Sequence, residues 1–142
     1  MQISQAVTEQ DIQTCLELRH VVFVEEQGVP VELEIDEHDS SDAYHFLGLV
    51  EGRPAAAARI CVFGDSAKIQ RVVVLKEFRG LKLGRALMVH LMEFARSRHL
   101  APTIALDAQT YAIRFYQSLG FEVQGEEFDD AGIPHIHMIQ PA

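Results

Sequence analysis

The feature that most constrains the fold is a change of hydrophobic period in the middle of the chain. Residues 68–75 are rich in β-branched and apolar side chains, as in a strand that is buried on both faces. After a turn that contains glycine, Leu83, Leu87 and Leu91 recur at helical spacing, which predicts a helix over residues 81–98. A buried strand that leads into an amphipathic helix predicts a sheet with a helix packed against one face.

The remaining segments are assigned from periodicity and from turn residues. Thr8 is predicted to cap the first helix, with Asp11 reaching back to its free amides, and Gly120 is predicted to end the last helix. The other expected elements are strand 2–7, a helix that ends before Gly28, the hairpin 44–51 and 55–63, strand 103–106, helix 112–119, and strands 121–124 and 134–139. Their order implies a mixed sheet with helices on its faces, of the α/β or α+β class.

Length and composition favour one domain over residues 1–142. The chain is 48% hydrophobic and 23% charged, which suits a single core of ordinary size. Its purely apolar runs are much shorter than the about 20 residues of a membrane span, and its start lacks the pattern of a secretion signal. We therefore expect a cytoplasmic protein without a membrane partner. Cys15 and Cys61 lie in apolar surroundings and are expected to be reduced core residues.

The charge is unevenly distributed along the chain. The 21 Asp+Glu exceed the 12 Lys+Arg and give a net charge of −9, which disfavours general binding to nucleic acid or anionic lipid. Seven of the cations nevertheless gather in one region: Arg71, Lys76, Arg79, Lys82, Arg85, Arg96 and Arg98. Nucleic-acid binding through the basic helix conflicts with the net charge, whereas a local anion site does not.

The turn between the central strand and the long helix is the best candidate for that anion site. It reads Arg-Gly-Leu-Lys-Leu-Gly-Arg over residues 79–85. Amides at a helix start, together with the positive end of the helix dipole, can bind a phosphate or pyrophosphate. The alternative is a helix start whose glycines serve packing and whose cations face solvent. The turn is not a Walker loop, and it fails the spacing of a dinucleotide fingerprint.

Two motifs in this order resemble those of a known family. Residues 72–88 resemble the acyl-CoA signature of the GNAT family of N-acetyltransferases, in which Val-x-Val ends a strand and Arg/Gln-x-x-Gly-x-Gly/Ala opens a helix. Residues 109–121 resemble Asn-x-x-Ala-x-x-Phe-Tyr-x-x-x-Gly-Phe, and residues 19–30 and 130–135 resemble the ElaA and YjcF type of small bacterial members. The resemblance covers nearly the whole chain. It implies the GNAT fold, a mixed and mostly antiparallel central sheet of six to seven strands with helices on both faces.

The resemblance also implies a binding site for acetyl-CoA as cosubstrate, without a metal. The amides of Val72 and Val74 would pair with the pantetheine arm, and the amide near Val74 would meet the oxyanion. The residues that the resemblance assigns to this site are Val72, Val73, Val74, Arg79, Gly80, Leu81, Lys82, Leu83, Gly84, Arg85 and Gln109. Lys82 stands where the family usually has a glycine. Its side chain could hinder the approach of a phosphate or offer it a charge, so the effect on CoA affinity stays open.

The reaction that the resemblance implies is direct transfer of an acetyl group to a primary amine in a ternary complex. The amine, small or peptidic, has a pKa near ~10 and must lose a proton to a base before it attacks. The departing thiol, with a pKa near ~8.5, benefits from an acid. Tyr116 stands at the family position for that general acid. The alternative for Tyr116 is an aromatic residue packed in the core.

The base is not determined by any motif. Gln70 lies near where some members carry a Glu, and an amide cannot take a proton. The candidates for a base or a substrate-side group are Glu25, Glu26, Glu34, Asp36, Glu37, His38 and His135. The eight acids of residues 25–42 would also attract a cationic amine, although a solvated acidic loop has the same composition. His135 and His137 would share a strand face, but no third metal ligand is evident.

Two hypotheses from different classes therefore remain. Arg79, Gly84 and Tyr116 favour an acetyltransferase, whereas Gln70 and Lys82 favour a non-catalytic module that binds or senses acyl-CoA. The acceptor amine is not given, because specificity lies in loops such as residues 25–42 and 126–132. A homodimer is one open arrangement, since residues 134–139 are expected at a sheet edge, where strands can pair between copies.

Overall fold

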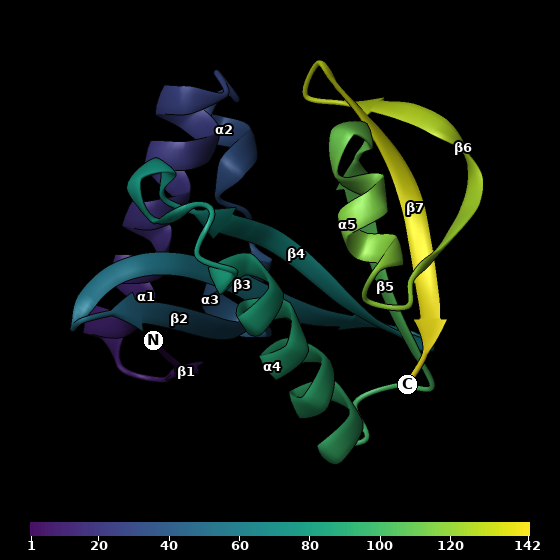
Figure 1. Cartoon of the computed structure of the whole chain (residues 1–142), viewed down its shortest axis with the longest axis horizontal. Coiled ribbons are helices and arrows are strands. Elements are labelled where there is room, and N and C mark those ends of the chain that lie inside the picture. Colours follow the sequence, from purple (N-terminus) through teal and green to yellow (C-terminus); the bar gives the residue numbers. More distant parts are fainter.

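The chain forms one mixed sheet whose strands are β1 (Gln2–Ala6), β2 (Tyr44–Val50), β3 (Arg53–Phe63), β4 (Ser66–Val74), β5 (Thr103–Gln109), β6 (Glu122–Asp130) and β7 (Ile133–Pro141). The computed structural model describes residues 1–142, except for the side chain of Ser41. The strand order is β1-β2-β3-β4-β5-β7-β6 (Figure 1). Only β4 and β5 are parallel. The predicted sheet of six to seven mostly antiparallel strands is therefore confirmed.

The parallel pair β4 and β5 separates soon after it begins. Ser66–Lys68 pairs with residues 103–105, and Lys68 and Ala105 are the last paired residues. Figure 1 shows β4 and β5 running apart from this point, so that β1–β4 form one half of the sheet and β5, β7 and β6 the other. Beyond Lys68 no strand pairs with β4 on the side of β5.

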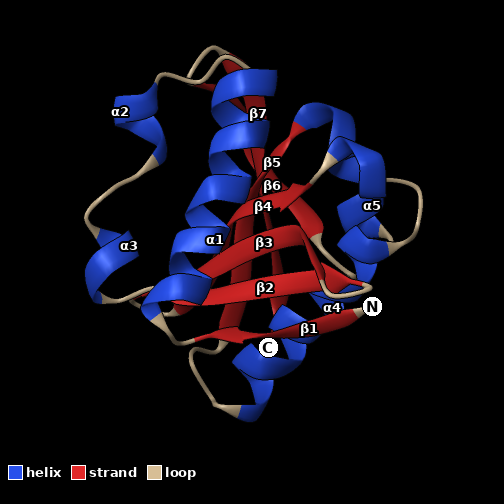
Figure 2. Cartoon of the chain, turned by 90° about the vertical axis from the view of Figure 1, so that its left-hand side faces the viewer, coloured by secondary structure: helices blue, strands red, loops and turns tan.

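Helices cover both faces of the sheet. They are α1 (Glu9–Arg19), the π-helical η1 (His20–Glu26), α2 (Val31–Glu34), α3 (His38–Ser41), the 3₁₀ turns η2 (Lys76–Phe78) and η3 (Thr110–Ala112), α4 (Leu83–Ser97) and α5 (Ile113–Gln117). Phe46 on β2 packs in the cluster of α4, and its neighbour Leu47 packs in the cluster of α1. Because successive strand residues point to opposite faces, α1 and α4 lie on opposite sides of the sheet (Figure 2).

The C-terminal hairpin differs from its prediction. Residues 126–132 were expected to be a loop, but β6 continues to Asp130, with an irregularity between Gln124 and Phe128. All nine residues of β6 are exposed, so no apolar alternation marks the strand in the sequence. The prediction that residues 134–139 form an edge strand is wrong, because β7 lies between β5 and β6. The edges are β1 and β6.

Two helical segments also differ from their predictions. The long helix begins at Leu83 and not at Leu81, because Lys82 has a φ of +60° in the left-handed region. The acidic segment, expected to be a loop with at most one helical turn, contains the two short helices α2 and α3. Too few apolar residues repeat there at any one period to reveal them.

Local predictions at three residues are confirmed. Thr8 caps α1 by accepting a hydrogen bond from the backbone amide of Asp11 at 3.1 Å. Cys15 and Cys61 are free thiols buried in the core. Burial raises the pKa of Cys15 to about 12, which keeps the thiol protonated and unreactive. None of the described helices is both long enough and apolar enough to cross a membrane.

Candidate active site

A cavity of about 610 Å³ lies where β4 and β5 separate. Several residues assigned from the sequence line it: Val72, Val73, Val74, Arg79, Gly84, Gln109, Tyr116, Glu26, Glu34 and His135. Others assigned from the sequence do not line it: Gly80, Leu81, Lys82, Leu83, Arg85, Glu25, Asp36, Glu37 and His38. Lys82 and Arg85 line a second, more open cavity beside α4. The structure thus brings the strand, the turn, the tyrosine and part of the acidic segment to one place.

The wall formed by β4 contains a bulge at Arg71. Arg71 has a φ of +56°, and the register with β3 shifts between Ala57 and Arg59. Val73 after the bulge packs in the α1 cluster, whereas Val72 and Val74 contact the α4 cluster. The backbone of β4 on the cavity side has no strand partner beyond Lys68. Such an open edge can pair with an extended ligand as another strand would.

The turn of residues 79–85 leads from this wall to the start of α4. Gly80 and Lys82 both have left-handed φ values, +86° and +60°. A lysine in this conformation is strained, which explains why glycine is the usual residue at such a position. No side chain caps the N-terminus of α4, so its first amides stay available to an anion.

Glu26, the last residue of η1, and Gln27, which follows it, each contact another wall of the cavity. Arg79 donates to both carboxylate oxygens of Glu26, at 2.7 and 2.8 Å, and its Nε donates to Val74 O at 2.9 Å. The hydrogen bonds between them lower the pKa of Glu26 and raise the pKa of Arg79. Gln109 on β5 donates to Gln27 at 3.0 Å. The residue expected to bind pyrophosphate is therefore held by a carboxylate.

Tyr116 on α5 reaches the cavity between two aromatic rings. Its ring meets those of Phe115 and Phe121 edge-on, at centroid distances of 5.0 and 6.2 Å. Burial raises the pKa of Tyr116 to about 12. No described residue forms a hydrogen bond with the Tyr116 hydroxyl. The described residues contain no fully buried side-chain oxygen without a partner, so this hydroxyl is accessible, and it opens to the cavity that Tyr116 lines. Tyr116 is therefore protonated at neutral pH and free to donate.

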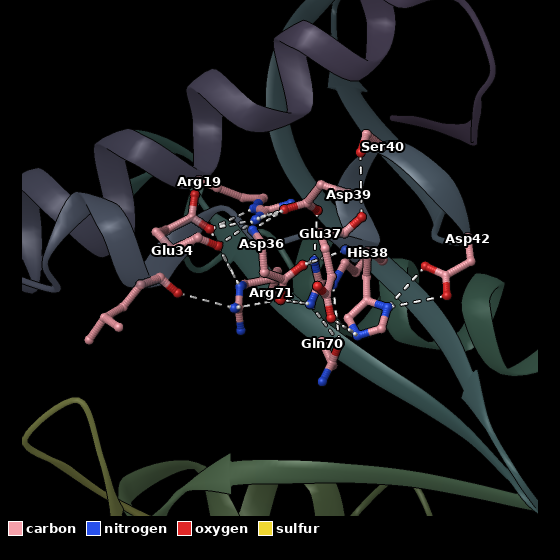
Figure 3. A network of polar contacts seen from close by, with 12 residues as sticks. Arg19, Glu34, Asp36, Glu37, His38, Asp39, Ser40, Asp42, Gln70 and Arg71 are labelled. Atoms are coloured by element: carbon pink, nitrogen blue, oxygen red, sulfur yellow. Dashed lines mark hydrogen bonds and ion pairs between the residues drawn. The ribbon is translucent and has the colours of Figure 1, made fainter.

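Three acids of the acidic segment, Glu34, Asp36 and Asp39, are paired with arginines (Figure 3). Buried Arg19 bonds the carboxylates of Glu34 at 2.5 Å and Asp39 at 2.6 Å. Buried Arg59 bonds Asp39 at 2.7 Å and Asp36 at 2.8 Å. Burial alone would raise the pKa of Asp39, but the hydrogen bond from Arg19 and its charge, together with the bonds from the Asp36 amide and Arg59, hold that pKa well below its usual range. The hydrogen bond from Arg59 likewise lowers the pKa of Asp36.

The remaining candidate bases are placed differently. Glu25 lies 3.6 Å from His20, and His38 bonds Asp42 at 3.0 Å, both outside the cavity. His135 lines the cavity, with its Nδ1 at 2.7 Å from the carbonyl oxygen of Ile133. A carbonyl oxygen only accepts, so Nδ1 carries the hydrogen, and neutral His135 keeps its lone pair on Nε2. Among these three residues only His135 combines access to the cavity with a free basic atom.

Lys68 and Asp107, which the sequence interpretation did not select, lie at the point where the strands part. Lys68 Nζ lies 2.6 Å from one oxygen of Asp107, and Nδ1 of His137 lies 2.7 Å from the other. Burial would raise the pKa of Asp107, but the hydrogen bonds from Lys68 and His137 lower it. Asp107 is the one charged residue of β5, and this break in an apolar strand could have marked it as functional.

Comparisons with known proteins agree with this geometry. Residues 4–140 match the acetyltransferase (GNAT) domain family. The uncharacterized N-acetyltransferase YjcF of Bacillus subtilis is 37% identical over 136 residues, which cover 95% of this chain and 96% of YjcF. The crystal structure of Escherichia coli ElaA has a TM-score of 0.89 and 32% identity, and the match covers 99% of both chains. An acyl-CoA N-acyltransferase from Pseudomonas aeruginosa has a TM-score of 0.89 and 28% identity, covering 98% of both. The chain belongs to the GNAT family, as its two motifs predict.

Proposed function

We propose that the protein is an acetyl-CoA-dependent N-acetyltransferase that acts on a primary amine by direct attack in a ternary complex. The observation that supports this most is the single cavity that joins the open edge of β4, Arg79 and Tyr116. These are the three parts that an acyl-CoA and its departing thiolate require. Family membership supports the same reaction class.

The donor would lie along the open edge of β4. The pantetheine arm would pair with the backbone of Val72 and Val74, and the pyrophosphate would meet the first amides of α4. Arg79 would then exchange its bonds to Glu26 for bonds to phosphate oxygens. The carbonyl oxygen of the thioester would be polarised by a backbone amide near Val74.

Tyr116 and His135 supply the acid and the base in this proposal. The amine nitrogen attacks the thioester carbonyl carbon and loses a proton to Nε2 of His135. The C–S bond then breaks, and the thiolate takes the proton of the Tyr116 hydroxyl. Both side chains line the cavity. Of the two carboxylate candidates on the cavity wall, Glu34 is bound by buried Arg19. Glu26 is bound by Arg79 until a phosphate takes its place.

Thiol release from acetyl-CoA in the presence of a panel of primary amines tests the proposal. We expect release that depends on both substrates and that yields one acetylated amine per thiol. Binding of acetyl-CoA without release for any amine would contradict the enzyme and favour the alternative of an acyl-CoA-sensing module. A His135→Gln variant should lose turnover, with the loss smallest at high pH, where more of the amine is already neutral. A His38→Gln variant, changed outside the cavity, is the matched control.

A further inference from the structure

The bulge of β4 presents two hydrogen-bond donors to the cavity that the protein leaves without acceptors. The first is the side-chain amide of Gln70. Arg59 donates from Nε and Nη2 to Oε1 of Gln70, at 3.1 and 2.8 Å. Because a guanidinium only donates, Oε1 must face Arg59, and the Nε2 amino group must point the other way. Figure 3 shows this nitrogen directed away from the network.

The second donor is the guanidinium of Arg71. Its Nε bonds the backbone oxygen of Glu34 at 3.1 Å, but its contacts with the Glu34 and Asp36 carboxylates are long, at 3.4 and 3.5 Å. Among the described residues none accepts from Nη1, which points away from the network in Figure 3. Arg19 and Arg59, in contrast, form bonds of 2.5–2.8 Å to their carboxylates. Arg71 therefore keeps donor capacity on the cavity side.

Acceptors face these donors across the cavity. Lys68 and Ala105 are the last paired residues of β4 and β5, so Gln70 and Asp107 each lie two residues further along the diverging strands. Both residues line the cavity, as His135 does. Each oxygen of Asp107 accepts one bond and has a second lone pair to offer. One wall thus offers donors, and the opposite wall offers acceptors.

We propose that the acceptor substrate is an amino acid, a primary amine with a carboxylate on the neighbouring carbon. The carboxylate binds Nη1 of Arg71 and Nε2 of Gln70, and the amine lies toward Asp107 and His135. A plain amine would leave both donors unpaired in a partly desolvated cavity, at a cost that the carboxylate removes. The proposal rests on the acetyltransferase function and specifies its acceptor.

The reaction is the transfer described above with a defined acceptor. The amino nitrogen forms the new C–N bond, the C–S bond breaks, and His135 takes the proton of the amine. The thiolate takes the proton of Tyr116. The products are CoA and an N-acetyl amino acid, and no oxidant or other reactant is needed.

Matched acceptors provide the first test. The amino acids are screened by thiol release, and the best one is compared with its carboxamide and with its decarboxylated amine. We expect kcat/KM for the amino acid to exceed both by at least about ten-fold, since charge-assisted hydrogen bonds to the carboxylate are lost in each analogue. Equal values for the three compounds would overturn the proposal, as would a protein that binds acetyl-CoA but acetylates no amino acid.

Variants of the two donors provide the second test. Gln70→Glu keeps the oxygen that Arg59 needs but replaces the donor with a negative charge. It should lower kcat/KM for the amino acid by at least about ten-fold without lowering that for the decarboxylated amine. Arg71→Gln should show the same selective loss, and Arg71→Lys should restore part of it.

Arg98→Gln is the matched control, because Arg98 is exposed at the far end of α4 and contacts Phe94. In this variant the ratio of kcat/KM for the amino acid to kcat/KM for the decarboxylated amine should equal that of the wild type. Equal losses for both acceptors in the Gln70 and Arg71 variants would overturn the proposal. Failure of the wild type to bind acetyl-CoA would instead contradict the proposed function itself.

Discussion

In the proposed transfer, Tyr116 has the most clearly defined chemical role of any single residue. Its position in the cavity, its accessible hydroxyl and its raised pKa of about 12 suit a group that stays protonated until a thiolate needs a proton. We expect Tyr116→Phe to lower kcat by about 10²-fold or more at saturating acetyl-CoA, because general-acid catalysis contributes on that order. The dissociation constant of CoA should change little, since one oxygen is lost.

The matched control for Tyr116 is Tyr44→Phe. Tyr44 packs against Phe94 outside the cavity, so its hydroxyl takes no part in transfer. Steady-state kinetics with a fixed amine and calorimetric titration with CoA measure the two effects separately. An unchanged kcat in Tyr116→Phe would exclude Tyr116 as the acid.

Lys82 stands where the family usually has a glycine, and it adopts a backbone conformation that glycine adopts more easily. At a φ of +60° a lysine is strained, whereas glycine is not. We expect Lys82→Gly to raise the free energy of unfolding by up to about 1 kcal/mol. Glycine relieves the strain of the left-handed conformation, but it also gives the unfolded chain more conformational entropy, which offsets part of the gain. Urea denaturation measures the difference. Lys76→Gly in η2 is the control and should lower stability, so a destabilised Lys82→Gly would contradict the conformational explanation.

Among the elements, η1 holds Arg79, which begins the turn proposed to bind the pyrophosphate. Its last residue, Glu26, occupies the guanidinium of Arg79 through two bonds. We expect Glu26→Gln to tighten CoA binding by about three-fold, because the carboxylate competes with pyrophosphate and an exposed ion pair contributes at most about 1 kcal/mol. The gain should shrink at high salt.

Glu25→Gln, one residue earlier on the exposed side of η1, is the control for this effect. It removes the same charge without touching Arg79. Titration calorimetry with CoA at low and high ionic strength measures both variants. Weaker binding in Glu26→Gln would mean that Glu26 positions Arg79 for phosphate and does not compete with it.

The elements also show where sequence prediction succeeds and where it stops. The helix around Leu83, Leu87 and Leu91 and the Thr8 cap are predictable because their signals are local. Strand β6 is predicted only as far as Gln124, because both faces of its continuation to Asp130 are exposed and no alternation appears there. The meeting of Lys68 with Asp107 depends on a parallel pairing between segments far apart in the chain, which no local pattern encodes.

Some residues of the candidate site are also predictable from the sequence, and others are not. A motif marks Tyr116, whereas the neutralisation of Glu34 and Asp36 depends on Arg19, Arg59 and Arg71, which come from α1, β3 and β4. Composition alone therefore does not show which acids of the segment are paired with arginines and which are exposed. The donors of Gln70 and Arg71 become visible only once these partners are known.

At the scale of the whole molecule, the buried ion pairs link stability to pH. The pKa values of Asp36, Asp39 and Asp107 are lower in the folded state than their ordinary values. The unfolded chain therefore binds more protons in acid. The free energy of unfolding should be highest above about pH 5 and should fall as the pH drops through the ordinary carboxyl range toward the folded values.

Asp39→Asn tests this dependence. At neutral pH it should cost about 3–5 kcal/mol, because Arg19 and Arg59 lose a buried charged partner. Its stability should also decline less steeply in acid. Asp65→Asn at an exposed turn is the control, with urea denaturation across the pH range as the measurement. A parallel decline in Asp39→Asn and the wild type would contradict the assignment of the pH dependence to this network.

We propose above all that the cavity between β4 and β5 and the turn beside it form an acyl-CoA site. Calorimetric titration with acetyl-CoA tests it most directly, using the wild type, Gly84→Glu and the control Val89→Glu. A Cβ at position 84 would lie 3.7 Å from Val74 and 3.8 Å from Phe115, which is ordinary contact, and the glutamate would bring negative charge to the phosphates. Val89 is exposed on the same helix.

We predict micromolar-range binding to the wild type and Val89→Glu, on the order of 8 kcal/mol, and none to Gly84→Glu. Full affinity in Gly84→Glu, or no binding to the wild type, would contradict the account.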